Sequence, residues 1–158
     1  MTPSHFKETS RRLPCKKPIL TADDLALLEQ LRAAKVVRFC MVTLNTPEMN
    51  ATIKAHFAAE GFDCAASTDR TDITDNYAMV QITPDEIATA ARECVASCGA
   101  AKPDAVIVYG TNTRGAPVAY QLEQDLGIPV FDSVAWGVFG ALRMAGVDIH
   151  PLTRWASR

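Results

Sequence analysis

The chain has 158 residues, of which 48% are apolar, and a formal net charge of −2 at pH 7, so length and composition predict one soluble globular domain. The basic residues are scattered apart from a short cluster at Arg11, Arg12, Lys16 and Lys17, and no aromatic residues are interleaved with them, which argues against nucleic acid as a partner. No apolar run approaches the roughly 20 residues of a membrane-spanning helix. The stretch MTPSHFKETSRRLP lacks the apolar core of a secretory signal, so we expect a cytoplasmic protein without a membrane partner.

The first part of the chain predicts a polar arm followed by a helix, a strand and a second helix. Residues 1–20 are polar, basic and interrupted by prolines, which is typical of a poorly ordered, flexible arm. An amphipathic helix follows in TADDLALLEQLRAAK, with Thr21 as its N-cap. The apolar, β-branched run VVRFCMVT, residues 36–43, predicts a buried parallel strand. Thr46 then begins a helix that ends at Gly61.

The second part of the chain contains a long connection and the remaining strands and helices. FDCAAS, residues 62–67, predicts a weaker strand, and TDRTDITDNYAMVQ predicts a long polar connection without regular structure. The clearest helix start is at Thr83, with proline next and a glutamate at the third helical position, and this helix ends at Gly99. The last predicted elements are a strand at 104–109, a helix at about 114–126 capped by Gly127, a strand at 128–131, a helix from Asp132 or Ser133 to Ala145, and a tail at 151–158.

The alternation of short apolar strands with helices defines the fold class. Such alternation implies right-handed crossovers and a parallel sheet that helices cover on both faces. We therefore predict an α/β protein with a doubly wound, four-stranded parallel sheet, in a single domain over residues 21–150.

The cysteines are predicted to be structural. There are five of them, an odd number without paired spacing, which in a cytoplasmic protein indicates free thiols. Cys94 and Cys98 share one face of a predicted helix, but no histidine is near them in the sequence, so small buried thiols explain them better than metal ligands do. Cys40 lies inside an apolar run and is predicted to fill the core. We predict no metal site.

Polar residues at the predicted strand ends are candidates for ligand binding. In open parallel sheets, ligands bind beyond the carboxyl ends of the strands, where helix N-termini and neutral donors suit a carboxylate or a phosphate. The candidates for binding a carboxylate are Thr43, Asn45, Gly110, Thr111, Asn112 and Ser133. The alternative is that GTNTRG only begins a helix, with Thr or Asn as the cap. The loop has neither a P-loop nor a GxGxxG pattern, and we expect no cofactor.

Three stretches resemble a known family: VTLNTPEMNATIKAHFAAEGFD, DITDNYAMVQITPDEIATAARE and DAVIVYGTNTRGAPVAYQLEQDLGIPVFDSVAWGVFGALRMAG. Over residues 20–146 the chain resembles the C-terminal half of the maleate cis-trans isomerase and arylmalonate decarboxylase branch of the aspartate/glutamate racemase superfamily. The resemblance implies two similar α/β halves with an active site between them. It also implies cysteines that act as acid, base or nucleophile at the carbon next to a carboxylate, without a cofactor.

The sequence departs from the family pattern at the residues that the resemblance associates with chemistry. Gly110 stands where a cysteine precedes TN in the family, and Asn45 stands where a tyrosine often follows the first strand, although Glu48 and Asn50 match. The N-terminal half, with its own cysteine, is not part of this sequence. Because a glycine cannot transfer a proton, we do not expect the family's thiol mechanism in this chain.

Three functional hypotheses remain open. The first is a half-length domain that binds a small carboxylate or dicarboxylate without thiol chemistry. The second is an active isomerase, racemase or decarboxylase that uses another residue. The weak catalytic candidates are Tyr77, Tyr109, Asp132 and Asp75, each of which also has a purely structural interpretation as a strand end, a helix cap or a turn. The third is a non-catalytic interaction module that pairs with a full-length relative.

A half-length chain is also expected to associate. An uncovered apolar face favours a homodimer or a partner half domain. The residues expected to supply that face are Leu25, Leu28 and Leu31 of the first helix, or Trp136, Val138 and Phe139 of the last. The alternative is that these side chains are core. His56, on a polar helix face, has no predicted role.

Overall fold

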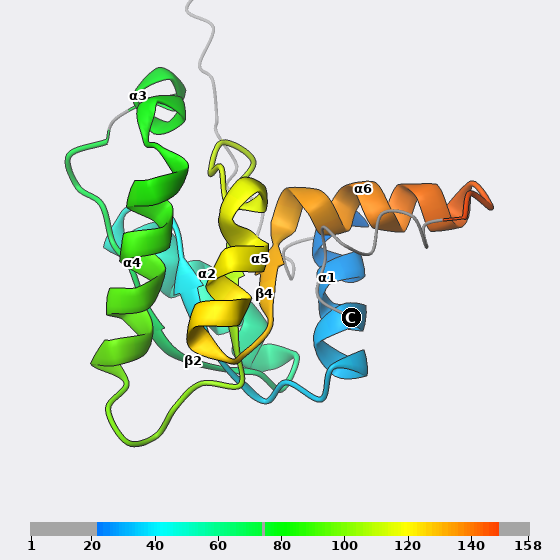
Figure 1. Ribbon diagram of the computed structural model, residues 1–158, viewed down its shortest axis with the longest axis horizontal. Helices are drawn as coiled ribbons and strands as arrows, with labels where there is room; N and C mark the ends of the chain where they lie inside the picture. Colours follow the sequence, from blue (N-terminus) through cyan, green and yellow to red (C-terminus); the bar gives the residue numbers. More distant parts are fainter. Residues whose placement is uncertain (1–21, 74, 149–158) are drawn as a thin grey trace, which may run out of the picture.

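The computed structural model describes residues 22–73 and 75–148, and Figure 1 shows a sheet with helices on either side of it. The predicted arm at 1–20 and the predicted tail at 151–158 lie outside the described residues. The elements are α1 (Ala22–Ala33), β1 (Arg38–Val42), α2 (Pro47–Ala59), β2 (Asp63–Ser67), α3 (Asn76–Gln81), α4 (Pro84–Ser97), β3 (Ala105–Val108), α5 (Ala116–Leu126), β4 (Val130–Asp132) and α6 (Ser133–Met144).

The strands form one parallel sheet in the order β2-β1-β3-β4, which confirms the predicted fold class. From β1 the chain winds to β2 at one edge, whereas from β3 it winds to β4 at the other, so the winding direction reverses between β1 and β3. Val42 and Val108, the last residues of these two strands, are in register. Ligand crevices of doubly wound sheets form at this reversal, outside the carboxyl ends of the strands.

Strands β1, β3 and β4 are almost entirely buried, as a parallel strand covered on both faces requires, whereas no residue of the edge strand β2 is buried. Along β1, Phe39 and Met41 pack into a cluster with residues of α1, α2 and α6, whereas Cys40 and Val42 pack into a second cluster with residues of α4 and α5. All four side chains are completely buried. The sheet therefore separates two apolar layers, each closed by its own set of helices.

Helices α2, α4 and α6 begin at the predicted capping residues, whereas the predicted cap Thr21 lies outside the described residues. The Thr83 hydroxyl accepts a hydrogen bond from the Glu86 N–H at 3.3 Å, and the Glu86 carboxylate accepts one from the Thr83 N–H at 2.8 Å, which makes a capping box. Thr46 caps α2, and Gly127 ends α5 in the left-handed conformation, with φ of 69°. Helix α5 begins at Ala116, slightly later than predicted.

The prediction of a connection without regular structure after β2 was wrong for its second half, because this part of the chain forms α3. The Asp75 carboxylate caps this short helix by accepting a hydrogen bond from the Ala78 N–H at 2.8 Å. Asp75, a weak catalytic candidate, thus has its structural role as a helix cap. The capping signal is visible in the sequence, but a helix of one to two turns is too short to show an apolar period.

The expected apolar face is mostly core. Leu28, Leu31, Trp136 and Phe139 are buried where α1 packs against α6, and Figure 1 shows these two helices crossing each other. They cannot supply an uncovered surface, because each helix covers the other. Of the candidates for that surface, Leu25 and Val138 remain exposed, at 51% and 52%.

One carboxylate joins the amino ends of β1 and β3. Oδ2 of Asp104 accepts hydrogen bonds from the backbone N–H groups of Arg38, at 2.8 Å, and Val37, at 2.9 Å. These hydrogen bonds, of which the one from Arg38 has the larger effect, lower the pKa of Asp104 below its usual value.

Among the helices of residues 22–73 and 75–148, none has the length and apolar character that crossing a membrane requires.

Candidate functional site

A groove of about 810 Å³ lies at the carboxyl ends of β1, β3 and β4, where the winding of the sheet reverses. Its lining includes five of the predicted carboxylate-binding residues: Asn45, Gly110, Thr111, Asn112 and Ser133. These residues are far apart in the sequence, and the parallel sheet brings them to one place. The sixth candidate, Thr43, is not part of the lining.

Thr43 lies beneath the groove and holds the loop after β1 in place. It is completely buried, and its hydroxyl accepts a hydrogen bond from the Asn45 N–H at 2.8 Å and donates to Oδ1 of Asn50 at 3.2 Å. The Nδ2 group of Asn50 donates in turn to the carbonyl of Thr68 at 2.9 Å. Because each buried polar group has a partner, the loop that presents Asn45 is held rigidly.

The loop after β3 has a backbone that only glycine adopts easily. Gly110 has φ of 131°, and a Cβ atom at this position would lie 2.9 Å from Oγ1 of Thr113. The Gly110 N–H already donates to the Ser133 hydroxyl at 3.1 Å, so this N–H is not offered to a ligand. Thr111 is exposed and Asn112 is half-buried, and their side chains are therefore the accessible donors of this loop, together with the O–H of Ser133.

Asp132 is part of the wall behind the groove and does not line it. It is 5% exposed and caps α6, with Oδ1 accepting a hydrogen bond from the Ala135 N–H at 2.9 Å. Burial raises its pKa, against hydrogen bonds from backbone N–H groups that include those of Ala116 and Gly115 at the start of α5. A Cβ atom on Gly115 would lie 2.8 Å from Oδ2 of Asp132 and 2.5 Å from Val108. Asp132 therefore holds the starts of two helices together.

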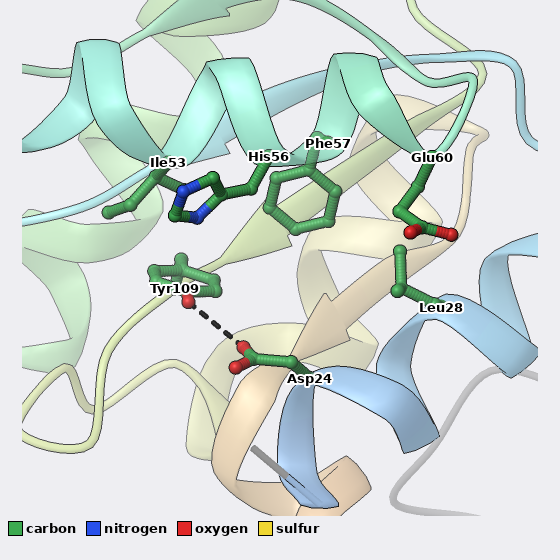
Figure 2. Close-up of a pocket in the computed structure, with 7 residues that line it drawn as sticks. All are labelled: Asp24, Leu28, Ile53, His56, Phe57, Glu60 and Tyr109. Atoms are coloured by element: carbon green, nitrogen blue, oxygen red, sulfur yellow. Dashed lines mark hydrogen bonds between the residues drawn. The ribbon is translucent and has the colours of Figure 1, made fainter. Parts of the chain in front are cut away.

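Tyr109 lies at the end of the groove beside α1 and α2. Its hydroxyl donates a hydrogen bond to Oδ1 of Asp24 at 3.0 Å, as Figure 2 shows. Burial and the Asp24 carboxylate raise the pKa of Tyr109, so the phenol is neutral and cannot act as a base near neutral pH. A small cavity of about 30 Å³ opens next to it and shares the side chains of Asp24, Ile53 and His56 with the groove.

The sequence hypotheses missed several polar side chains of the groove, among them His56 and Asp24, and included candidates that do not line it. His56 was given no role, but it lines the groove with Met49, Thr52 and Ile53 on one face of α2, and their spacing of three and four residues is a signal that could have found it. Asp24 comes from α1, distant in sequence from the other lining residues, and no local pattern marks it. The catalytic candidate Tyr77 is 77% exposed and does not line the groove.

The polar lining consists mainly of neutral donors. They are Asn45, Thr52, Asn76, Thr111, Asn112, Thr113 and Ser133. Among the described lining residues, Asp24 is the one carboxylate and His56 is the one imidazole. Within the described part of the chain, no group of three His, Cys, Asp or Glu side chains could hold a metal ion. Such a surface can bind an anion through hydrogen bonds and helix N-termini.

The fold and the groove define a doubly wound α/β domain with a crevice of neutral hydrogen-bond donors at the point where the sheet reverses. A family model described as arylmalonate decarboxylase matches residues 7–154, so the chain belongs to the arylmalonate decarboxylase family, within the Asp/Glu racemase superfamily. This confirms the resemblance seen in the sequence. No curated protein matches the chain.

Solved structures of this superfamily share the fold. A crystal structure of arylmalonate decarboxylase superposes with a TM-score of 0.70 at 22% identity and covers 78% of this chain and 53% of that chain. Maleate cis-trans isomerase from Nocardia farcinica, bound to TRIS, gives a TM-score of 0.69 at 25% identity, with 80% and 50% covered. The maleate isomerase Iso from Pseudomonas putida S16 gives 0.67 at 17% identity, with 79% and 49% covered. This chain thus spans about half the length of each of these proteins.

Proposed function

We propose that this chain binds a small carboxylate or dicarboxylate in the groove between the loops after β1, β3 and β4. The observation that carries the proposal is the convergence of Asn45, Thr111, Asn112 and Ser133 on one groove at the switch point of the sheet. Neutral amide and hydroxyl donors beside helix N-termini suit a carboxylate group. Membership of the arylmalonate decarboxylase family supports the same ligand class.

The proposed role is binding without the family's thiol chemistry. One matched structure is a Cys-to-Ser mutant of the Nocardia farcinica isomerase with a covalently bound succinylcysteine intermediate. In this chain no cysteine is among the described residues that line the groove, and Gly110 occupies the position before Thr111 and Asn112. A nucleophilic thiol in the groove would have to come from outside the described residues.

A partner that covers the groove is the second part of the proposal. Apolar side chains at its rim are exposed: Met49 at 55%, Val134 at 41% and Val138 at 52%. Contact with a second copy, or with a separate half domain, would bury them and exclude water from the ligand. Light scattering after size exclusion tests the homodimer, because a mass near 17.1 kDa at tens of micromolar would remove it.

The position of Tyr109 in the groove favours a second candidate function, namely an enzyme that uses a residue other than cysteine. It lines the groove directly before Gly110, and its neutral hydroxyl can donate a proton but not abstract one at neutral pH. If this candidate were correct, the unmodified chain would turn over a dicarboxylate substrate and Tyr109→Phe would abolish that turnover.

Ligand-dependent melting tests the binding proposal. Malonate and maleate, each in a millimolar series, should raise the melting temperature. A ligand at ten times its Kd adds about 1.4 kcal/mol to the free energy of unfolding, which corresponds to roughly 3–6 °C for a chain of this size. Asn112→Ala should reduce the shift. Gln124→Ala, which removes an amide from the exposed face of α5, should not. A melting temperature that stays constant across both series would refute carboxylate binding.

A further inference from the structure

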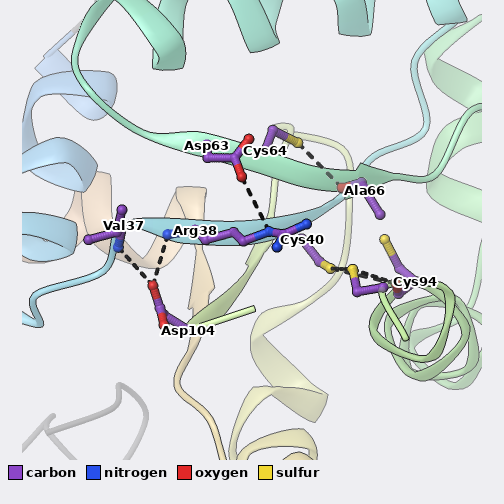
Figure 3. Close-up of polar contacts among 9 residues, drawn as sticks. Val37, Arg38, Cys40, Asp63, Cys64, Ala66, Cys94 and Asp104 are labelled. Carbon is purple, nitrogen blue, oxygen red and sulfur yellow. Dashed lines mark hydrogen bonds and ion pairs between the residues drawn. The ribbon is translucent and has the colours of Figure 1, made fainter. Parts of the chain in front are cut away.

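Three cysteines that the proposed function does not use meet between β1 and α4. Cys40 is in the middle of β1 on the face that α4 covers, Cys94 lies in the last turns of α4, and Cys98 is the C-cap residue of that helix. Figure 3 shows the side chain of Cys40 reaching from β1 towards Cys94 on α4, and the sulfur atom of Cys98 lies next to that of Cys40. None of the three lines the groove.

The geometry of the group joins residues that are far apart in the chain. The Sγ atoms of Cys40 and Cys98 are 3.2 Å apart, across a sequence separation of 58 residues. Both thiols also donate to the carbonyl of Cys94, each at 3.5 Å. A disulfide has an S–S distance of about 2.05 Å, so the two sulfur atoms need to approach by little more than 1 Å. Because Cys98 ends its helix, the backbone there can adjust without breaking the ladder of α4.

The thiols differ in exposure and in acidity. Cys40 is completely buried, Cys94 is 5% exposed and Cys98 is half-buried. The side-chain interaction with Cys94 and burial raise the pKa of Cys40, and the side-chain interaction with Cys40 lowers the pKa of the Cys94 thiol. Cys98 is therefore the thiol that a small oxidant in solvent reaches first, whereas Cys40 keeps its proton until it reacts.

We propose that Cys40 and Cys98 form a reversible disulfide, with hydrogen peroxide as the oxidant. The Cys98 sulfur attacks one peroxide oxygen, the O–O bond breaks, and a sulfenic acid and water form. The Cys40 sulfur then attacks the Cys98 sulfur, the S–O bond breaks as the S–S bond forms, and the Cys40 proton leaves with the hydroxyl as a second water. Two thiols are oxidised by two electrons in total, and one molecule of hydrogen peroxide is reduced.

The expected partner is Cys40 rather than Cys94. Cys94 and Cys98 are four residues apart on α4, where the helix holds the Cβ atoms about 5–6 Å apart, beyond the roughly 3.5–4.5 Å of a disulfide. Cys40 comes from the strand that α4 covers, and its sulfur atom is in contact with that of Cys98. The link would pin the end of α4 to β1, and a thiol reductant would release it.

Peptide mapping of the intact chain tests the proposal. The purified protein is treated with dilute hydrogen peroxide, blocked with N-ethylmaleimide and digested without reduction. We expect a cross-linked peptide pair that contains Cys40 and Cys98, loss of two of the five titratable thiols, and full recovery of those thiols with dithiothreitol. Cys98→Ser should abolish the cross-link. Cys64→Ser, which removes a half-buried thiol that bonds to the carbonyl of Ala66 on β2, should leave it unchanged.

The variants also separate the reaction from a folding defect. Cys98→Ser changes a half-buried residue and is expected to melt at the temperature of the unmodified chain. Cys40→Ala removes the other thiol of the pair and should also abolish the cross-link. Oxidation of Cys98 to a sulfinic acid without a cross-link would overturn the proposal. A bridge from Cys98 to any thiol other than that of Cys40 would overturn it as well, and so would a full count of reactive thiols after peroxide treatment.

Discussion

Replacing Gly110 by cysteine puts a thiol into the groove, and we predict that it destabilises the chain without creating an enzyme. A non-glycine residue at φ of 131° costs about 1–3 kcal/mol. The new Cβ atom would also lie 2.9 Å from Oγ1 of Thr113, which donates to the Tyr109 carbonyl at 3.4 Å. Moving that hydroxyl breaks this hydrogen bond, which lowers the free energy of unfolding by a further amount of about 0.5–1.5 kcal/mol. The total is roughly 2–4 kcal/mol, or a melting temperature lower by about 5–15 °C.

Two further variants show which part of the substitution lowers the free energy of unfolding. Gly110→Ala should cost as much as Gly110→Cys, because the backbone and the Cβ atom, not the thiol, cause the strain. Gly99→Ala, at φ of 60° with no atom within 4 Å of the added Cβ, should cost only about 1–2 kcal/mol. Thermal and urea unfolding measure all three. The reasoning about this loop would be refuted if Gly110→Cys melted at the temperature of the unmodified chain. Racemase, isomerase and decarboxylase assays on Gly110→Cys alone should stay at background.

Two other predictions concern carboxylates that hold the fold together. Asp104→Ala should lower the free energy of unfolding at pH 7 by about 1–2 kcal/mol, because two backbone hydrogen bonds are lost. The pKa of Asp104 is lowered in the folded state. Its contribution to the free energy of unfolding is therefore complete above the unfolded-state pKa and disappears as the pH falls through the folded-state pKa. Urea unfolding at pH 7 and pH 3 should show that the stabilities of the variant and the parent converge in acid. Asp132→Ala should cost about 2–3 kcal/mol through the lost cap and the unpaired N–H groups at the starts of α5 and α6. Asp132→Asn should cost less, because burial raises the pKa of Asp132 and the neutral amide keeps an acceptor without a buried charge.

Each of these carboxylate predictions has a clear contrary result. If the stabilities of Asp104→Ala and the parent differed by the same amount at both pH values, the Asp104 hydrogen bonds would not depend on its charge. If Asp132→Asn were as unstable as Asp132→Ala, the charge of Asp132, and not its role as an acceptor, would hold the two helices. Equilibrium unfolding followed by circular dichroism distinguishes these cases.

The elements that were predictable from the sequence carry local signals. Thr83, with Glu86 three residues later, marks a helix start that tertiary contacts do not need to enforce. The run Ala105–Val108 is apolar throughout because both of its faces are covered. The same logic places Asn45 and Asn112 at one edge of a parallel sheet, which is why these groove residues could be proposed before the fold was known.

The misses depend on contacts between distant segments. Thr43 has the composition of a binding residue, but its hydroxyl is used by Asn50 and Asn45 inside the protein, and no local pattern separates the two roles. Asp24 reaches the groove only because α1 packs against α6. The meeting of Cys40 and Cys98 depends on how α4 lies on β1. Helix packing, which no short motif specifies, decided each of these placements.

The absence of a side chain at Gly115 has a mechanical consequence for the groove. Any larger residue there would collide with Val108 and Asp132, so the two helix starts and the end of β3 meet without a gap, around one carboxylate. Because both helix starts contact Asp132, a shift of α5 would also displace α6. The wall that carries Ser133 and the β3 loop is therefore a single stiff piece. The opposite side of the groove is packed less tightly, because the short helix α3, which contributes Asn76 and Met79, contains no buried residue.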